Sequence, residues 1–273
     1  MVAWVNRGLD VLPPGRWLHR ILRRGLEWTE MDFTLPHAGP GLDGLRIAFL
    51  SDIHAGSYLD QGDLVRIFAD LARREPDLVC LGGDLINTRR EEILLFEKAL
   101  ALIDPPLGVY AVPGNHDHFW GKDLGYWRDR LEEMGVHVLI NEGRRLQHGG
   151  DSFWLAGVDD LTEAQPDLAL ALAGACEDEP TILLAHHPDF FFESSAVCVD
   201  LTLSGHTHGG QVRLGSWVPI RHSRFGWLGG RYELEGSQLY VSRGVGVTLL
   251  PIRLGTKAEI PFLRLRSPSP DDR

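Results

Sequence analysis

The sequence predicts an α/β fold in which strands are buried beneath helices. From about Leu45 onward, short apolar runs alternate with segments of helical period, which is the pattern of an α/β sandwich. The chain has 273 residues, of which 44% are hydrophobic, so it can bury a full core within one catalytic domain. After Gly209 the sequence becomes rich in strand-like segments. We therefore expect one sandwich of sheets and helices.

Seven short apolar runs are predicted to form the central strands. They span residues 45–50, 78–81, 109–112, 136–140, 153–158, 182–185 and 199–203. Further along, residues 232–234 and 239–242 flank the turn 235–237, which is typical of a β-hairpin. These segments supply the sheets of the predicted sandwich.

Three segments between the strands have the spacing of helices. The first begins near Asp63, an acidic residue suited to a helix start, and its apolar residues recur at helical spacing. The second fits residues 91–103 and is closed by Pro105. The third fits residues 123–134 and is closed by Gly135.

The charge and the cysteine content disfavour two classes of protein. A protein that binds DNA or RNA by neutralising phosphates needs a basic face, whereas this chain has a formal net charge of −11. We therefore expect no nucleic-acid partner. Cys80, Cys176 and Cys198 form no C-x-x-C pair, so they indicate neither a disulfide framework nor a zinc ribbon. We expect each to be a small buried residue in a reducing compartment.

The first 30 residues differ in composition from the rest of the chain. Residues 1–30 are interpreted as a basic amphipathic segment, residues 31–266 as the catalytic domain and residues 267–273 as a disordered tail. In the first segment, apolar residues at helical spacing alternate with arginines; these residues are Trp17, Leu18, Ile21, Leu22 and Leu26, with Arg16, Arg20, Arg23 and Arg24. This is the composition of an interfacial helix that contacts the inner membrane surface. The alternative is a helix that packs against the sandwich or a partner subunit.

The sequence predicts a cytoplasmic location. It contains no run of 18 or more apolar residues that could span a bilayer. Its N-terminus also lacks the apolar region and small-residue cleavage site of a secretory signal. Any membrane association is therefore expected to be peripheral.

Five of the apolar runs end in a polar group of metal-ligand type. In chain order these groups are Asp52-Ile53-His54, Gly82-Gly83-Asp84, Gly114-Asn115-His116-Asp117, His186-His187 and Gly205-His206-Thr207-His208. Functional groups in open α/β sheets collect beyond the carboxyl ends of strands, so these groups are expected to converge on one edge. Residues i and i+2 of an extended strand point the same way, so Asp52 and His54 can face one place.

A single such group is weak evidence. A D-x-H string arises readily by chance, and a histidine after a buried strand is more often structural than a metal ligand. Five groups at the same position relative to an apolar run are much harder to attribute to chance.

The ordered set D-x-H, G-G-D, G-N-H-D, H and G-H-T-H resembles the calcineurin-like metallophosphoesterase superfamily. The longer strings S-D-I-H-A-G, H-H-P-D and S-G-H-T-H-G-G-Q-V resemble its bacterial YaeI/YkuE-like branch. The resemblance covers about residues 45–263 and includes the late segment 241–246. It implies a four-layer α/β/β/α sandwich, with two mixed β-sheets face to face and helices outside.

The resemblance also implies a centre of two divalent metal ions. One ion would be held by Asp52, His54, Asp84 and His208, and the other by Asp84, Asn115, His186 and His206. The shared carboxylate of Asp84 would offset the repulsion between two dications about 3.5–4 Å apart. Mixed oxygen and imidazole ligands suit Mn²⁺, Fe or Zn²⁺, of which Mn²⁺ is favoured. His186 is preferred to His187 because it comes first after its strand and occupies the family position.

The activity implied by the resemblance is hydrolysis of a phosphodiester by a metal-bridging hydroxide. His116 holds the family position for stabilising or protonating the leaving group, and a structural histidine is the competing interpretation. A narrower alternative is a UDP-2,3-diacylglucosamine-type pyrophosphohydrolase, which would act on a lipid-linked nucleotide at the membrane. A non-catalytic metal-binding scaffold is disfavoured because every ligand position is filled.

Several other side chains have more than one interpretation. His187 either supports a metal ligand, contacts the substrate or lies on the surface, and Asp117 either orients a ligand or caps a turn. His118, His148 and His222 match no ligand position. The stretches 118–122 and 217–227 combine aromatic and cationic residues, which indicates either an apolar wall beside the phosphate site or ordinary loop packing.

Overall fold

The computed structural model describes residues 25–56, 58–118, 124–215, 217–248 and 251–269. Its strands are β1 (Glu27–Thr34), β2 (Arg46–Leu50), β3 (Leu78–Leu81), β4 (Val109–Ala111), β5 (Val136–Val138), β6 (Glu142–His148), β7 (Asp151–Gly157), β8 (Thr181–Leu184), β9 (Leu201–Ser204), β10 (Gly230–Leu234), β11 (Ser237–Val241) and β12 (Glu259–Arg266). Its α-helices are α3 (Gln61–Ala72), α4 (Glu97–Leu100), α5 (Gly125–Glu133), α6 (Leu168–Ala171) and α7 (Phe191–Ser195). The 3₁₀ helices are η1 (Pro40–Leu42), η2 (Arg90–Phe96), η3 (Pro188–Phe190) and η4 (His208–Gly210).

The strands form two mixed sheets of six strands each. The first sheet has the order β1-β12-β2-β3-β4-β5, in which β2 to β5 are parallel and β12 is antiparallel to β2. The second has the order β10-β11-β9-β8-β7-β6, in which β11, β9, β8 and β7 are parallel. The parallel strands of each sheet therefore end at a common edge, which positions the loops that follow them.

Alternate residues of each central strand face different apolar layers. In β2, Ile47 and Phe49 contribute to the core that also contains residues of both sheets. Ala48 and Leu50 belong instead to the cluster with Phe68 of α3. Because side chains alternate along a strand, burial on both faces requires the continuous apolar run seen in the sequence.

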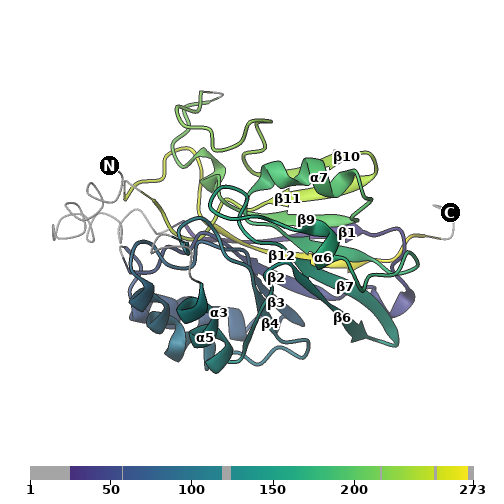
Figure 1. Ribbon diagram of the computed structural model, residues 1–273. Coiled ribbons are helices and arrows are strands. Elements are labelled where there is room, and N and C mark those ends of the chain that lie inside the picture. Colours follow the sequence, from purple (N-terminus) through teal and green to yellow (C-terminus); the bar gives the residue numbers. More distant parts are fainter. Residues whose placement is uncertain (1–24, 57, 119–123, 216, 249–250, 270–273) are drawn as a thin grey trace.

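The helices cover the outer faces of the two sheets. Trp127 of α5 packs in the same cluster as α3, and both helices lie beside β2, β3 and β4 (Figure 1). Across the second sheet, Phe191 of α7 packs against Leu239 and Val241 of β11. The predicted four-layer α/β/β/α sandwich is thus confirmed.

Most of the predicted elements are present in the structure. The seven predicted strands correspond to β2, β3, β4, β5, β7, β8 and β9, and β10 and β11 form the predicted hairpin. Helix α3 begins at Gln61, and Asp63 lies in its first turn as predicted, where it forms a capping box with Asp60. The segment 91–103 contains η2 and the short α4 instead of one continuous α-helix.

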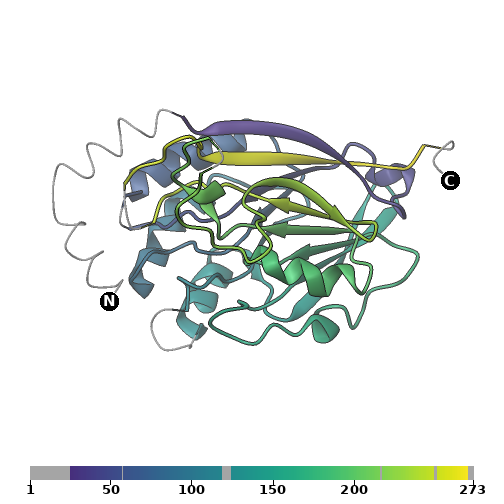
Figure 2. The same ribbon diagram turned by 90° about the horizontal axis from the view of Figure 1, so that it is seen from above.

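The sequence analysis did not assign β1, β6 or β12. β1 pairs in parallel with β12, from Glu27 opposite Glu259 to Thr34 opposite Arg266, and the two strands lie side by side in Figure 2. Residues 27–30, which the sequence analysis placed in the N-terminal segment, are therefore part of the first sheet. Residues 1–24, which contain most of the predicted amphipathic helix, lie outside the described residues.

Three further findings concern the tail, the cysteines and membrane spans. Ser267 donates hydrogen bonds to Asp43 and Gly39, while residues 270–273 lie outside the described part of the chain. Cys80 is buried as predicted, but Cys176 and Cys198 are exposed because they lie in the loops that follow α6 and α7. No helix among the described residues is long and apolar enough to cross a membrane.

Candidate metal centre

The seven predicted ligands lie in the loops that directly follow five parallel strands. These strands are β2, β3 and β4 of the first sheet and β8 and β9 of the second. Asn115 and His206 are partly buried, and the other five are fully buried. The structure therefore brings together at one edge the groups that the sequence analysis expected to converge.

The backbone at this edge has an unusual conformation. Five predicted ligands have positive φ angles between 49° and 68°: Asp52, His54, Asp84, His206 and His208. Non-glycine residues rarely adopt such angles, and they persist only where surrounding contacts enforce them. Here the N–H groups of Asp52 and His54 donate to the carbonyls of Gly83 and Asp84, each at 3.0 Å. The loops after β2 and β3 thereby hold each other in place.

Glycine is required where these loops approach one another most closely. Gly83 has a φ of +89°, and a Cβ atom at this position would lie 2.6 Å from Nδ1 of His186. A side chain would therefore both strain the backbone and displace a predicted ligand.

The first group of predicted ligands contains Asp52, His54 and His208. The Nε2 atoms of His54 and His208 lie 3.1 Å apart. Nε2 of His208 lies 3.5 Å from Oδ1 of Asp52. One ligand atom from each of the three residues falls within 4.8 Å of the others, which suits a single metal ion.

The second group contains Asp84, His186 and His206, whose ligand atoms also lie within 4.8 Å of one another. Nε2 of His186 lies 3.3 Å from Oδ2 of Asp84. Asn115 joins this group because its Oδ1 lies 2.9 Å from Nδ1 of His206. A carboxylate, an amide oxygen and two imidazoles therefore face one place.

Asp84 connects the two groups. Its Oδ2 lies 3.6 Å from Nε2 of His54 in the first group and 3.3 Å from Nε2 of His186 in the second. Its Oδ1 accepts a hydrogen bond of 2.7 Å from the backbone N–H of His116. This position fits a carboxylate shared by two cations.

The unsatisfied atoms of the site fit a bound metal. Nδ1 of His186 donates to the carbonyl of Gly82 at 2.7 Å. Nε2 of His186 is buried and has no hydrogen-bond partner, although Oδ2 of Asp84 is only 3.3 Å away. Buried polar atoms without partners are rare and costly, whereas a cation between these two atoms would satisfy both.

The electrostatics of the site also fit a cation. Burial lowers the pKa of His54 to about 3, and burial holds the pKa values of His206 and His208 well below the ordinary range. These imidazoles are therefore neutral and keep a lone pair for a metal. Burial raises the pKa of Asp52 to about 6, and the nearby carboxylate of Asp84 adds to this effect.

Asp84 and His186 shift each other's pKa in opposite directions. Burial favours the neutral carboxyl of Asp84, but His186 and His116 outweigh it and hold the pKa of Asp84 well below its usual range. Burial likewise favours neutral His186, but Asp84 outweighs it and raises the pKa of His186 well above its usual range. A metal must displace the proton of His186, so affinity for the metal should rise with pH.

Asp117 fixes the loops that carry two predicted ligands. Its carboxylate accepts hydrogen bonds from the N–H groups of Gly114, Leu85 and Ile86 at 2.9, 3.1 and 3.2 Å. These residues adjoin Asn115 and Asp84, so Asp117 caps both loops together. Of the two interpretations from the sequence, capping is the one these contacts support.

His116 has a defined orientation beside the two groups. Its Nδ1 lies 2.8 Å from the carbonyl oxygen of Asn87. A carbonyl can only accept, so Nδ1 of His116 carries the proton in this hydrogen bond. The His116 and His54 rings meet edge to face, with their centroids 4.5 Å apart. One ring nitrogen of His116 also lies within 4.8 Å of a ring nitrogen of His54 and a carboxylate oxygen of Asp84.

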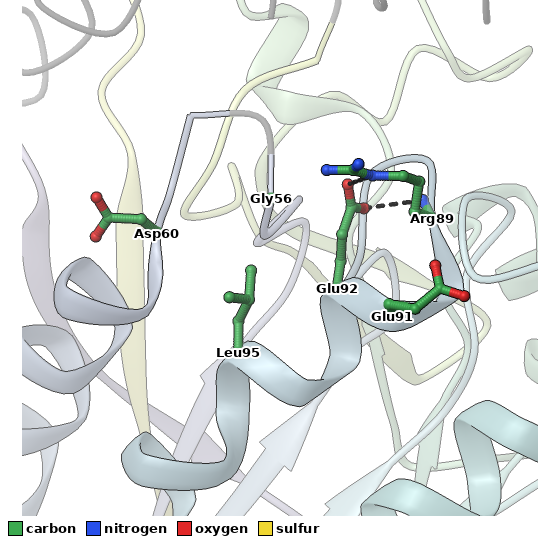
Figure 3. Close-up of a pocket in the computed structure, with 6 residues that line it drawn as sticks. All are labelled: Gly56, Asp60, Arg89, Glu91, Glu92 and Leu95. Atoms are coloured by element: carbon green, nitrogen blue, oxygen red, sulfur yellow. Dashed lines mark hydrogen bonds and ion pairs between the residues drawn. The ribbon is translucent and has the colours of Figure 1, made fainter.

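Glu92 supports the loop that orients His116. Its Oε2 accepts hydrogen bonds from the N–H groups of Asn87, Thr88 and Arg89 at 2.9, 2.8 and 3.0 Å. Figure 3 shows Glu92 beside Arg89 and Gly56. The loop 87–89 is therefore held in a conformation that presents the Asn87 carbonyl to His116.

Arg253 is a further residue of the site, which the sequence pattern did not predict. Its guanidinium donates to the carbonyl oxygens of His208, Gly244 and Gly246 at 3.1, 3.1 and 2.6 Å. Its Nη2 also lies 3.3 Å from Nδ1 of His208. Burial lowers the pKa of Arg253 to about 10. Arg253 thus holds the loop 244–246 against a predicted ligand.

The remaining histidines fall into different roles. His222 matches no ligand position in the sequence, and it lies near the site, with its ring centroid 5.4 Å from that of His206. The ring of His187 lies 4.3 Å from that of His206, and its Nδ1 accepts from the N–H of Asp189 at 3.2 Å. His118 pairs with Asp159 at 2.8 Å, and His148 ends β6.

The chain is similar in sequence to proteins of a phosphoesterase family. The sequence profile described as calcineurin-like phosphoesterase matches residues 45–210. The Bacillus subtilis protein described as the uncharacterized metallophosphoesterase YkuE is 31% identical over 261 residues, which cover 92% of this chain and 88% of YkuE. A Bos taurus transmembrane protein with a metallophosphoesterase domain is 32% identical over 258 residues, 88% of this chain but 57% of that protein. The crystal structure of TT1561 of Thermus thermophilus covers 74% of this chain and 90% of its own, with 15% identity and a TM-score of 0.49.

Proposed function

Because the chain belongs to the calcineurin-like metallophosphoesterase family, we propose that it is a phosphodiester hydrolase that requires two divalent metal ions. The observation that carries this proposal is the position of Asp84, whose carboxylate contacts the imidazoles of both His54 and His186. Hydrolysis of phosphoesters follows from the family. The preference for diesters is the part that this proposal adds.

The proposed metal ligands are those expected from the sequence. Asp52, His54, Asp84 and His208 would hold one ion, and Asp84, Asn115, His186 and His206 the other. Mn²⁺ is the favoured metal, with Fe and Zn²⁺ as alternatives. When bound, two such ions lower the pKa of water and neutralise charge on the phosphoryl oxygens.

The protein's own residues would then orient the substrate and supply a proton. Asn87 keeps the Nδ1 proton of His116 in place, so only Nε2 can exchange a proton with a leaving group. The leaving oxygen of an alkyl phosphate ester departs as an alkoxide, which needs a proton donor more than an aryloxide does. His116 would therefore matter most for a substrate with an alkoxide leaving group.

Activity with a panel of substrates tests the proposed function. Purified protein loaded with Mn²⁺ is expected to hydrolyse bis-p-nitrophenyl phosphate faster than p-nitrophenyl phosphate, and to lose this activity after chelation. The panel includes UDP-2,3-diacylglucosamine, because the alternative function is hydrolysis of a lipid-linked pyrophosphate. A protein that cleaves monoesters and leaves every diester intact would contradict the proposal.

We further propose a cytoplasmic protein whose basic N-terminal segment, up to the start of β1, contacts the inner membrane surface. Arginines add about 1 kcal/mol each near an anionic bilayer, and the interspersed Trp and Leu side chains add burial. The full-length protein is expected to sediment with anionic vesicles at low salt, whereas a form that begins at Gly25 should stay in solution. Equal sedimentation of the two forms would show that the segment does not bind membranes.

A further inference from the structure

The proposed metal centre adjoins a cavity of about 270 Å³. His208 and His222 line it together with the apolar side chains of Val212, Pro219 and Ile220. His208 also belongs to the first group of predicted metal ligands. A molecule that fills this cavity would therefore contact a residue of the proposed metal centre.

The lining of this cavity suits an apolar group. Among its lining residues in the described part of the chain, only the two histidines are titratable. Hydrocarbon can therefore enter without desolvating a fixed charge.

A second cavity, of about 360 Å³, has the opposite character. Figure 3 shows the carboxylates of Asp60, Glu91 and Glu92 around it, with the guanidinium of Arg89. Three carboxylates disfavour both a phosphate and a hydrocarbon chain. The cavity beside His208 is therefore the better site for part of an ester substrate.

Hydrogen bonds hold the apolar cavity in shape. Nε2 of Gln211 donates to the carbonyl of Thr248 at 2.9 Å, and the N–H of Thr248 donates to Oε1 of Gln211 at 3.0 Å. Both residues line the cavity, so this pair ties two of its walls together. A preformed cavity binds a ligand without the cost of ordering its walls.

The apolar surface continues beyond the cavity. Val212 pairs with Leu254, and Leu214 pairs with Trp217, in isolated bridges. Leu214, Trp217 and Leu254 are 57%, 58% and 50% exposed. Leu254 thus lies beside Val212, which lines the cavity, and an exposed apolar side chain at that position can extend the binding surface.

We propose that this cavity binds a flexible apolar ester group of the phosphodiester substrate, such as an alkyl chain. The phosphate end lies among the imidazoles of His206, His208 and His222, and the chain lies along Val212 and Ile220. This inference rests on the proposed function and gives it a substrate class.

A series of p-nitrophenyl alkyl phosphates tests the inference with full-length protein loaded with Mn²⁺. The alkyl group stays on the product, so kcat/KM should rise about two- to fourfold for each methylene from methyl to octyl. Ile220→Asp is expected to flatten this dependence. Leu170→Asp is the control, because Leu170 on α6 is about as exposed as Ile220 but lies outside the cavity lining. This variant should keep the dependence of kcat/KM on chain length.

Calorimetry separates this inference from the proposed function. Octylphosphonate is expected to bind the Mn²⁺-loaded protein at least about tenfold more tightly than methylphosphonate, with the gain lost in Ile220→Asp. Equal affinities, together with hydrolysis that does not depend on chain length, would overturn the cavity proposal and leave the proposed function intact. If no diester is hydrolysed, the proposed function fails, and the phosphonate affinities still decide whether the cavity binds alkyl chains.

Discussion

Replacement of Asp84 by alanine is expected to remove both metal ions and to lower kcat/KM at least about 10³-fold. Asp84 contacts an imidazole of each predicted ligand group and is the proposed carboxylate shared by the two ions. Without it, the remaining ligands of each ion are mostly neutral, and the repulsion between two dications is no longer offset. His54→Ala should weaken mainly one ion, because His54 belongs to the first group.

Elemental analysis and thermal unfolding test the role of Asp84 separately from activity. Wild-type protein should hold two ions per chain and unfold at a higher temperature when Mn²⁺ is added, because ligands that bind the native state stabilise it. Asp84→Ala should hold none and show no such rise. Asp70→Ala is a control, because it removes an exposed carboxylate paired with Arg73 on α3. A single tightly held ion in an active wild-type protein would contradict the shared role.

The convergence of the site was predictable because its cause is local. Each predicted ligand follows an apolar run, and parallel strands end at a common edge. The runs themselves were recognisable because both faces of strands such as β2 are buried. Position relative to a strand was therefore enough to place Asp52, Asp84 and His186 near one another.

The first and last strands were not predictable in the same way. β1 contains Glu30 and Asp32 between its apolar residues, and its neighbour β12 lies more than 220 residues away in sequence. Such pairing depends on long-range contacts that no local pattern records. The N-terminal segment was therefore defined with residues that in fact pair in the sheet.

Arg253 was not predicted because its charged side chain points inward while its apolar neighbours are exposed, which is the reverse of the usual distribution. Ile252 and Leu254 are 36% and 50% exposed, while the guanidinium between them points inward to four backbone and side-chain acceptors around His208. A pattern of this kind in sequence predicts that the apolar residues face the core. The carbonyls of Gly244 and Gly246, which make the inward position favourable, come from a loop that only the fold brings near.

The second large effect is expected at His116. His116→Ala should lower kcat for a diester with an alkoxide leaving group about 10²- to 10⁴-fold, the range typical of a lost general acid, while both metal ions remain bound. The loss should be much smaller for a p-nitrophenyl leaving group, because that group departs without protonation. His148→Ala, at the end of β6, is a matched control that should change neither rate nor metal content.

The geometry allows His116 two roles, which the variant distinguishes. His54, Asp84 and His116 place ligand atoms within 4.8 Å of one another, so distance alone would allow His116 to bind a metal. Its Nδ1 donates to the Asn87 carbonyl at 2.8 Å, so Nε2 is the atom that would bind a metal or donate a proton. His116→Ala distinguishes the two roles. Loss of a metal ion from the variant would identify His116 as a ligand. Normal metal content, together with a loss of rate that grows with the basicity of the leaving group, would identify it as the general acid. Near-normal turnover of the alkoxide diester would exclude the acid role.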